Sequence, residues 1–305
     1  MLEPAGPGAE HAARLWWPML WISAVVFVIV AGLLIASILR GRREHEAGID
    51  RSEPRWGEPF IAIAGVGVPA LILIGVYLFS LAEMHALQAS GSDPVMTIEV
   101  SARDWWWEAR YPNGAITANE IHIPTGVPVR LDLTTRDVIH SFWVPRLQVK
   151  TDNIPGRHNF MWIQADRPGR YRGFCAEFCG LQHANMNFWV VAESGQDFDT
   201  WVESQAAPVA EPTAPDALEG ASIFLTSSCS GCHAIRGTTA QGVAGPDLTH
   251  LASRETLAGV LPNTAAGLAR FISDPQGVKP GVAMPPSELT DSELQAVLAF
   301  LEQLN

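Results

Sequence analysis

The sequence contains very little lysine. Lys150 and Lys279 are the only two lysines among its 305 residues, and arginine supplies the other positive charges. Acidic residues outnumber basic ones by 32 to 20, so the formal net charge is −12. A surface of this sign repels phosphate groups, which excludes a nucleic-acid-binding protein and is compatible with a basic protein partner.

Cysteine is also scarce, with four residues in two close pairs: Cys175 with Cys179, and Cys229 with Cys232. One interpretation is two disulfides in an exported protein. Histidine and methionine, however, stand at ligand spacing beside each pair. We therefore favour cofactor binding by both pairs, which leaves no cysteine for a structural bridge.

Two long segments near the N-terminus, 15–39 and 60–82, contain no charged residue and no histidine. Each exceeds the roughly 20 residues that a helix needs to cross a bilayer core. We predict a transmembrane hairpin whose second helix is interrupted by Gly65, Gly67 and Pro69. Because these spans lack ionisable residues, they cannot form an intramembrane haem, copper or proton site by themselves. The first segment is too long for a signal peptide and has no basic region before it.

Arginines gather between the two spans, whereas the N-terminal tail has only Arg14. The arginines between the spans are Arg40, Arg42, Arg43, Arg51 and Arg55. The positive-inside rule puts this loop in the cytoplasm. We therefore predict a multi-pass protein of the bacterial plasma membrane. Both termini and both folded domains would lie on the outer, periplasmic side.

The pattern changes to short alternating strands from residue 93. Four segments alternate or have strand composition: 95–100, 127–133, 159–163 and 187–191. Turn residues between them indicate a β-sandwich or barrel. Residues 197–204 fit a short closing helix.

Residues 204–216 are rich in Ala and Pro, which is typical of a semi-extended linker. Residues 217–305 are helical in pattern, and Thr290 with Glu293 forms a capping box before a helix over 291–301. The predicted domains are 1–92 for the tail and membrane helices, 93–203, a linker at 204–216, and 217–305.

The strongest motif is a loop that offers thiolate, imidazole and thioether groups. Its candidate ligands are Cys175, Glu177, Cys179, His183 and Met186. These groups suit copper, and two cysteines on one loop can bridge two ions. A second imidazole is needed, and His140 in the segment Ile139–Pro145 is well placed. Zinc could use two Cys and two His, but it would leave Met186 unexplained. His122 and His158 have no motif around them, so we interpret both as surface or structural residues.

Cys229-Ser-Gly-Cys232-His233 is the C-x-x-C-H motif for covalent attachment of haem c. A thioredoxin-like pair is the alternative, but it needs a βαβ context that the pattern lacks. Met284 is the only methionine after Met186, so it is the candidate sixth ligand. The rival imidazole is His250. A Met/His pair would raise the haem potential.

The C-x-E-x-C-x-x-x-H-x-x-M loop with its upstream His-Ser-Phe resembles subunit II of cytochrome c oxidases, over about residues 15–200. The resemblance implies a cupredoxin-like Greek-key domain with a dinuclear copper centre, CuA, bridged by Cys175 and Cys179. The terminal ligands it implies are His140, His183 and Met186. Glu177 would offer its backbone carbonyl to copper, and its carboxylate would bind a Mg²⁺ shared with subunit I. By the same match, Trp105 in the Trp105-Trp106-Trp107 segment is the residue through which electrons enter.

Residues 217–305 resemble an all-α class I cytochrome c domain, through Gly245-Pro-Asp-Leu248 and Met284-Pro-Pro286. A fusion of this kind resembles the caa-type haem–copper oxidases. Subunits II often carry a proton-uptake Glu seven residues before a helix proline, a position that Ala62 occupies here. Glu58 is off that register, and we interpret it as an interfacial charge.

The resemblance implies an electron-transfer subunit of a respiratory oxidoreductase and translocase. Electrons would pass from haem c to CuA and then to a partner, subunit I. That partner would reduce oxygen to water, coupled to proton translocation. Subunit III would be a further partner, and the donor would be a cytochrome c or a quinol-oxidising complex. The alternatives are a CuA-containing subunit of a nitric-oxide reductase and a stand-alone membrane-tethered electron carrier.

Overall fold

The computed structural model describes residues 3–47, 57–89 and 94–305. The chain divides into two compact units. One is a pair of long helices within residues 10–90, and the other contains residues 3–9 and 91–305. Arg51 and Arg55, which contributed to the topology prediction, lie outside the described residues.

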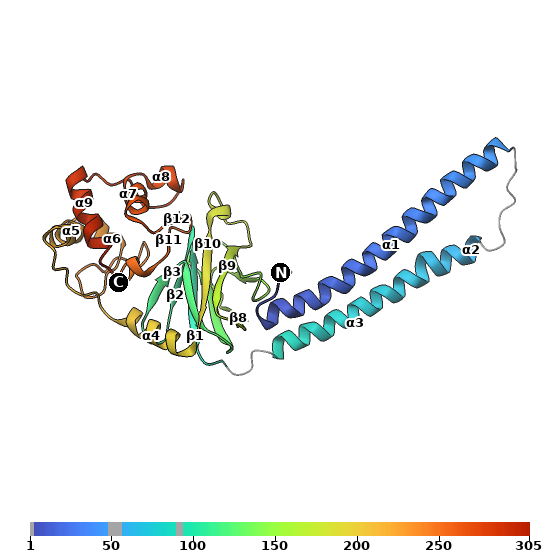
Figure 1. Cartoon of the computed structure of the whole chain (residues 1–305), viewed down its shortest axis with the longest axis horizontal. Coiled ribbons are helices and arrows are strands. Elements are labelled where there is room, and N and C mark those ends of the chain that lie inside the picture. The colour runs from blue at the N-terminus through green and yellow to red at the C-terminus, as the bar shows by residue number, and fades with distance from the viewer. Residues whose placement is uncertain (1–2, 48–56, 90–93) are drawn as a thin grey trace. The chain divides into compact units, whose positions relative to one another are not determined.

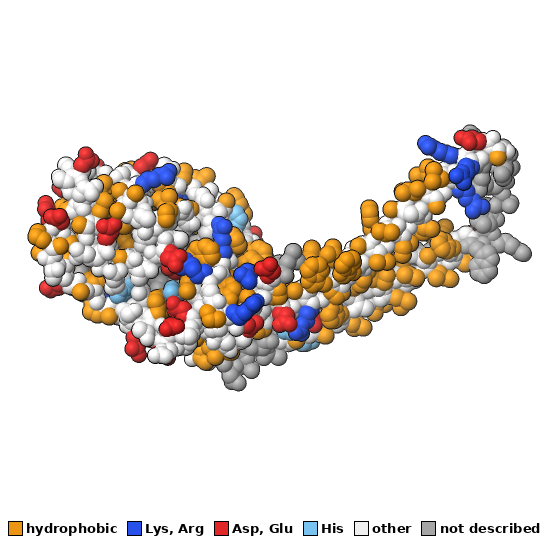
Figure 2. Space-filling view, in the orientation of Figure 1, with side chains coloured by type: hydrophobic (Ala, Val, Ile, Leu, Met, Phe, Trp, Pro, Cys, Tyr) orange, Lys and Arg blue, Asp and Glu red, His pale blue; other side chains and the backbone are white. Residues whose placement is uncertain are grey.

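The helical unit is formed by α1 (Pro7–Glu46) and by a second, continuous helix that includes α2 (Gly57–Phe60), η1 (Ile61–Gly67) and α3 (Val68–Ala89). Both helices are long and apolar enough to cross a membrane, and the predicted spans 15–39 and 60–82 lie inside them. Hydrophobic side chains cover the helices (Figure 2), and none of the 18-residue apolar windows is buried within the protein. The lipid core would supply the apolar contacts that the fold does not.

The predicted interruption of the second helix is a π-helical segment, η1. Pro69 lies two residues after its end and has no N–H to donate to the carbonyl one turn before. A wider helical turn at this point is a common response to a lost bond in the ladder. Near one end of the unit, His11 Nδ1 lies 2.5 Å from Glu83 Oε2 and so links α1 to α3.

The β domain consists of two five-stranded sheets (Figure 1). The first has the order β3-β2-β1-β5-β8, with bounds Ile116–Ala118, Trp106–Arg110, Thr97–Arg103, Val129–Thr135 and Asn159–Ile163. The second has the order β4-β10-β9-β6-β7, with bounds Glu120–Pro124, Asn187–Glu193, Gly169–Cys175, His140–Trp143 and Thr151–Asn153. One parallel pair in each sheet, β1 with β5 and β4 with β10, accompanies the antiparallel pairs, which fits a cupredoxin-like sandwich.

Alternation along the strands builds the core between the sheets. In β5, every second residue from Val129 to Leu133 is buried, because successive strand residues face opposite sides. Trp107, Phe142 and Phe188 meet in the centre with ring centroids 4.4–5.4 Å apart. The four predicted strand segments all coincide with strands, displaced by up to three residues at their ends.

The C-terminal domain contains α5 (Pro215–Thr226), α6 (Cys229–Cys232), α7 (Ala265–Ser273), α8 (Pro275–Val278) and α9 (Asp291–Leu301). The short 3₁₀ segment η3 (Leu251–Ser253) and a hairpin of β11 (Thr256–Leu257) and β12 (Leu261–Pro262) complete it. Helices α5 and α9 approach closely at Gly220, where a Cβ would lie 1.9 Å from the Ala296 carbonyl oxygen. The predicted capping box of Thr290 and Glu293 is present at the start of α9.

The connection between the two domains is shorter than predicted. Helix α4 extends over Gly195–Ala206, beyond the expected 197–204, because the Ser194 side chain caps its first turn. Pro215 already occupies the first turn of α5, where its missing N–H has no cost. The predicted linker of 204–216 was therefore wrong at both ends. Of these residues, only 207–214 lie outside helices.

Candidate metal centre and haem site

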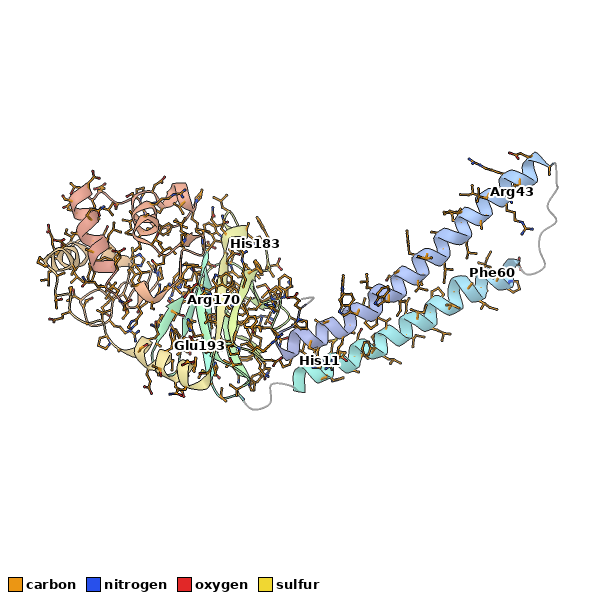
Figure 3. The ribbon with its side chains drawn as sticks, in the orientation of Figure 1. His11, Arg43, Phe60, Arg170, His183 and Glu193 are labelled. Atoms are coloured by element: carbon orange, nitrogen blue, oxygen red, sulfur yellow. The ribbon has the colours of Figure 1, made fainter. Side chains whose placement is uncertain are left out.

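The candidate metal centre lies at one end of the second sheet, where strand β9 finishes and strands β6 and β10 begin. Strand β9 finishes at Cys175, the ligand loop follows, and β10 begins at Asn187. Strand β6 starts at His140 and pairs with β9, with Phe142 opposite Cys175. The sheet register thus brings the distant His140 beside the loop. His183 begins the short 3₁₀ segment η2 (His183–Asn185) within that loop (Figure 3).

The sequence-predicted ligands converge on the two thiols. The Sγ atoms of Cys175 and Cys179 are 3.7 Å apart, well beyond the ~2.05 Å of a disulfide. His140 Nδ1 lies 3.8 Å from Cys175 Sγ, while His183 Nδ1 lies 3.7 Å from Cys179 Sγ. Met186 Sδ lies 3.8 Å from Cys179 Sγ. One imidazole therefore lies beside each sulfur, and the Met186 thioether lies beside the second sulfur, so these donors fit a metal centre.

The centre is almost closed to solvent. His140 is fully buried, and Cys175, Cys179 and Met186 are each at most 6% exposed. The Cys179 thiol next to Cys175 lowers the pKa of Cys175, although burial opposes ionisation. The same neighbour, together with burial, raises the pKa of Cys179. The pair thus favours one thiolate without metal, and binding of metal ions would displace the remaining proton.

Asp137 fixes the orientation of His140. Its Oδ1 lies 2.6 Å from His140 Nε2, so the imidazole donates outward and presents Nδ1 to the sulfurs. Burial opposes protonation of His140, but its hydrogen bonds with Asp137 and Cys175 outweigh burial and raise its pKa to about 9. The sequence analysis missed Asp137, whose only signal was a carboxylate three residues before a candidate ligand.

Glu177 presents two groups in different surroundings. Its backbone carbonyl oxygen lies 3.2 Å from Cys175 Sγ, which fits the expected carbonyl ligand. Its carboxylate is 46% exposed and lies 3.5 Å from Lys150 Nζ. The carboxylate therefore points away from the sulfurs.

The candidate haem site is a cavity of about 280 Å³ lined by Cys229, Cys232, His233 and Met284. The single helical turn of α6 places the two cysteines at an i, i+3 spacing, on one face. Met284 packs against the core of the C-terminal domain. The donor set at this cavity fits a c-type haem with His and Met as axial ligands.

The surroundings of His233 fit a metal-binding imidazole. Its Nδ1 lies 2.8 Å from the Pro246 carbonyl oxygen, so Nδ1 carries the proton and Nε2 is free for a metal. Burial lowers the pKa of His233, which keeps the ring neutral. Gly245 allows the loop to pass close to the ring, because a Cβ there would lie 2.5 Å from Cε1.

Trp105 lies between the two sites. Its indole Nε1 donates to the Cys179 carbonyl oxygen over 2.8 Å. Trp105 and Trp106 both line the haem cavity. Trp107, two residues on, is fully buried, and its ring centroid lies 6.2 Å from that of His140. The three tryptophans therefore have separate positions, and among them only Trp105 both lines the cavity and bonds to the backbone of a candidate metal ligand.

Three further histidines of the two folded domains, His122, His158 and His250, have structural partners. His122 stacks on Trp201 with centroids 3.8 Å apart, and His158 Nδ1 lies 3.0 Å from Asp132 Oδ1. His250, the rival sixth ligand, directs Nε2 toward the Ala207 carbonyl oxygen at 3.0 Å. These contacts agree with the interpretation of His122 and His158 as structural or surface residues.

Comparison with known proteins matches both domains. Residues 115–194 match the family "Cytochrome C oxidase subunit II, periplasmic domain", and residues 217–305 match "Cytochrome c". A cytochrome c oxidase subunit 2 from Alkalihalophilus pseudofirmus is 34% identical over 99% of this chain and 90% of its own length. One from Bacillus sp. strain PS3 is 34% identical over 81% of this chain and 72% of its own length. The chain thus belongs to the cytochrome c oxidase subunit II family, as a membrane-associated component of an oxidoreductase, with a cytochrome c domain fused at its C-terminal end.

Proposed function

We propose that this chain transfers electrons from a covalent haem c to a dinuclear CuA centre and from there to subunit I of the oxidase. The observation that carries the proposal is the position of Trp105, which lines the haem cavity and donates to the carbonyl of Cys179. The Trp105 side chain thereby reaches from the haem cavity to a residue of the candidate copper centre. Trp105 is the residue through which electrons would reach copper.

The copper centre would be held by Cys175, Cys179, His140, His183, Met186 and the Glu177 carbonyl. When bound, the metal pair supplies one-electron transfer with little change in its bonds. The residues contribute rigidity, because His140 and Cys175 belong to paired strands and their side chains are buried. The haem would be held by Cys229, Cys232, His233 and Met284.

The Glu177 carboxylate is the proposed Mg²⁺ ligand from this chain. It is a hard oxygen donor, and its partial exposure leaves room for a partner's ligands. Lys150 now pairs with it and would have to give up that contact. Replacement of Glu177 by Gln should therefore weaken Mg²⁺ binding in the assembled complex and leave the copper content unchanged.

Membrane topology follows from the arginines of the helical unit. Arg43 lies at one end of α1 and His11 at the other (Figure 3). We propose that the end with Arg40, Arg42 and Arg43 is cytoplasmic, which places both termini and both folded domains in the periplasm. Subunits I and III would complete the complex, and a cytochrome c or a quinol-oxidising complex would donate electrons. Oxygen reduction and the coupled proton translocation would occur in subunit I.

The proposal is tested on the purified complex by metal analysis and by a laser flash that reduces the haem. We expect two copper ions and one covalent haem per chain, followed by oxidation of the haem as copper becomes reduced. Replacement of Trp105 by Phe should slow that step, with unchanged metal and haem content. Zinc in place of copper, or a haem that never passes its electron to copper, would refute the proposed function.

A further inference from the structure

Lys279 is a buried cation outside every motif described above. It follows α8 in the cytochrome domain, and only 2% of its surface is exposed. Burial lowers the pKa of its ammonium group to about 8, so the group is still charged at neutral pH. A buried charge is costly unless its donors are satisfied, so its partners decide what it does.

The Lys279 ammonium group donates to three backbone carbonyls. The distances from Nζ are 2.7 Å to the Ala258 oxygen, 2.8 Å to the Trp105 oxygen and 3.4 Å to the Asn185 oxygen. An ammonium group has three donors, and here each has an acceptor. Ala258 belongs to the cytochrome domain, whereas Trp105 and Asn185 belong to the copper domain. The side chain thus fastens one domain to the other.

The two carbonyls in the copper domain lie beside the metal ligands. Trp105 is bonded through its indole to Cys179, and Asn185 lies between His183 and Met186 in the ligand loop. On the same face, Gln182 Nε2 donates to the Pro280 carbonyl oxygen over 2.8 Å. A Cβ on Gly281 would lie 3.3 Å from Trp105, so the chain after Lys279 passes close to the indole ring. The contact between the domains is therefore made beside the proposed path of the electrons from haem to copper.

This contact differs from an exposed charge pair. Exposed pairs steer encounters and are weakened by salt, whereas desolvated charged hydrogen bonds act mainly on dissociation. Removing the ammonium group would leave the three carbonyl oxygens without their charged hydrogen-bond donor. Leaving buried polar groups unsatisfied is usually more costly than the net gain from the bond.

We propose that Lys279 is a positioning residue that locks the cytochrome domain onto the copper domain, with the haem cavity held against Trp105. This inference rests on the proposed route from haem to copper, which it deepens by assigning the residue that keeps the route assembled. With the lock in place, transfer needs no domain movement. Without it, a larger fraction of the cytochrome domains would be undocked and would have to return to position before transfer.

The test compares Lys279→Met, Lys279→Gln and the control Arg270→Met in the purified complex. Met removes all donors, Gln keeps two N–H donors without charge, and Arg270 is an exposed cation on α7 of the same domain. Two quantities are measured after the haem content has been checked. One is the haem-to-copper rate after a flash, at increasing solvent viscosity, and the other is amide hydrogen exchange in peptides that contain Ala258 and Asn185.

We expect the wild-type rate and that of Arg270→Met to be independent of viscosity. Lys279→Met should raise the undocked population by about tenfold or more, slow transfer, make it viscosity-dependent and increase exchange in both peptides. Lys279→Gln should fall between the two, and it carries the test if the Met variant does not load haem. Wild-type rates and exchange in both Lys279 variants would overturn the inference. If wild type transfers no electron to copper, the proposed function fails, and the exchange data still decide whether Lys279 locks the domains.

Discussion

The hydrogen bond between Asp137 and His140 gives the sharpest prediction for the copper centre. Replacing Asp137 by Asn removes the carboxylate that lies 2.6 Å from His140 Nε2. Carboxylate partners of metal-binding histidines typically contribute about 10–100-fold in metal affinity, or about 1.4–2.7 kcal/mol. We expect a loss in this range, because the ring loses both its orientation and part of its basicity.

The size of the loss should depend on pH. The metal-free pKa of His140 is raised to about 9, so at pH 7 copper must displace a proton from the ring. Asparagine lowers that pKa and thereby eases proton displacement, which offsets part of the loss at pH 7. Above the wild-type pKa of His140, proton competition disappears and the full loss should be visible. The defect of Asp137→Asn is therefore expected to be larger at pH 9.5 than at pH 7.

The assay is copper retention by the full-length chain against a competing chelator at both pH values. Asp132→Asn is the matched control, because Asp132 contacts His158 at 3.0 Å in the same domain, away from the sulfurs. The control should retain copper like wild type. Equal affinity of Asp137→Asn and wild type at the higher pH, or a greater defect at pH 7, would refute the reasoning.

Three further predictions concern the cytochrome domain and its contact with the copper domain. Met284→Leu should leave the haem attached through Cys229 and Cys232 but lower its reduction potential by a sizeable part of the ~0.8 V range that axial ligands span, measured by redox titration; an unchanged potential would exclude Met284 as the ligand. Thr290→Ala should destabilise this domain by about 1 kcal/mol in urea unfolding, because it removes the capping box of α9; Ser287→Ala, outside the helix, should have little effect. The haem-to-copper rate should change little between about 0.05 and 0.5 M salt, because buried contacts are screened less than surface charges; a steep fall would instead indicate charge steering.

Candidate ligands could be proposed from the sequence where they are close together in it. The loop from Cys175 to Met186 and the Cys229–His233 motif contain most of the donors within a few residues, and spacing alone relates them to chemistry. His140 could be proposed from the sequence only as a second imidazole from elsewhere in the chain, because its place beside Cys175 depends on the pairing of β6 with β9. Strand alternation predicted the β domain, since one face of a strand such as β5 is buried.

Residues that act through tertiary contacts were not predictable. Asp137 and Lys279 stand in no motif, and their partners are a distant ring and three backbone carbonyls. Sequence gives no signal for burial of a single lysine, because the usual expectation for lysine is exposure. The linker was misjudged for a related reason, since a cap at Ser194 and a proline at the start of α5 extend helices into an Ala- and Pro-rich segment.

The short connection between α4 and α5 also limits how far the haem can travel. Residues 207–214 span about 28 Å when fully extended, at about 3.5 Å per residue. A cytochrome domain released from the copper domain would therefore remain within one domain diameter of it and would rebind at an effective concentration in the ~mM range. A connection of this length is too short for the cytochrome domain to carry electrons from a distant reductase. On the proposed route, the electron donor would have to come to the oxidase and approach the cytochrome domain on a face that the copper domain leaves open.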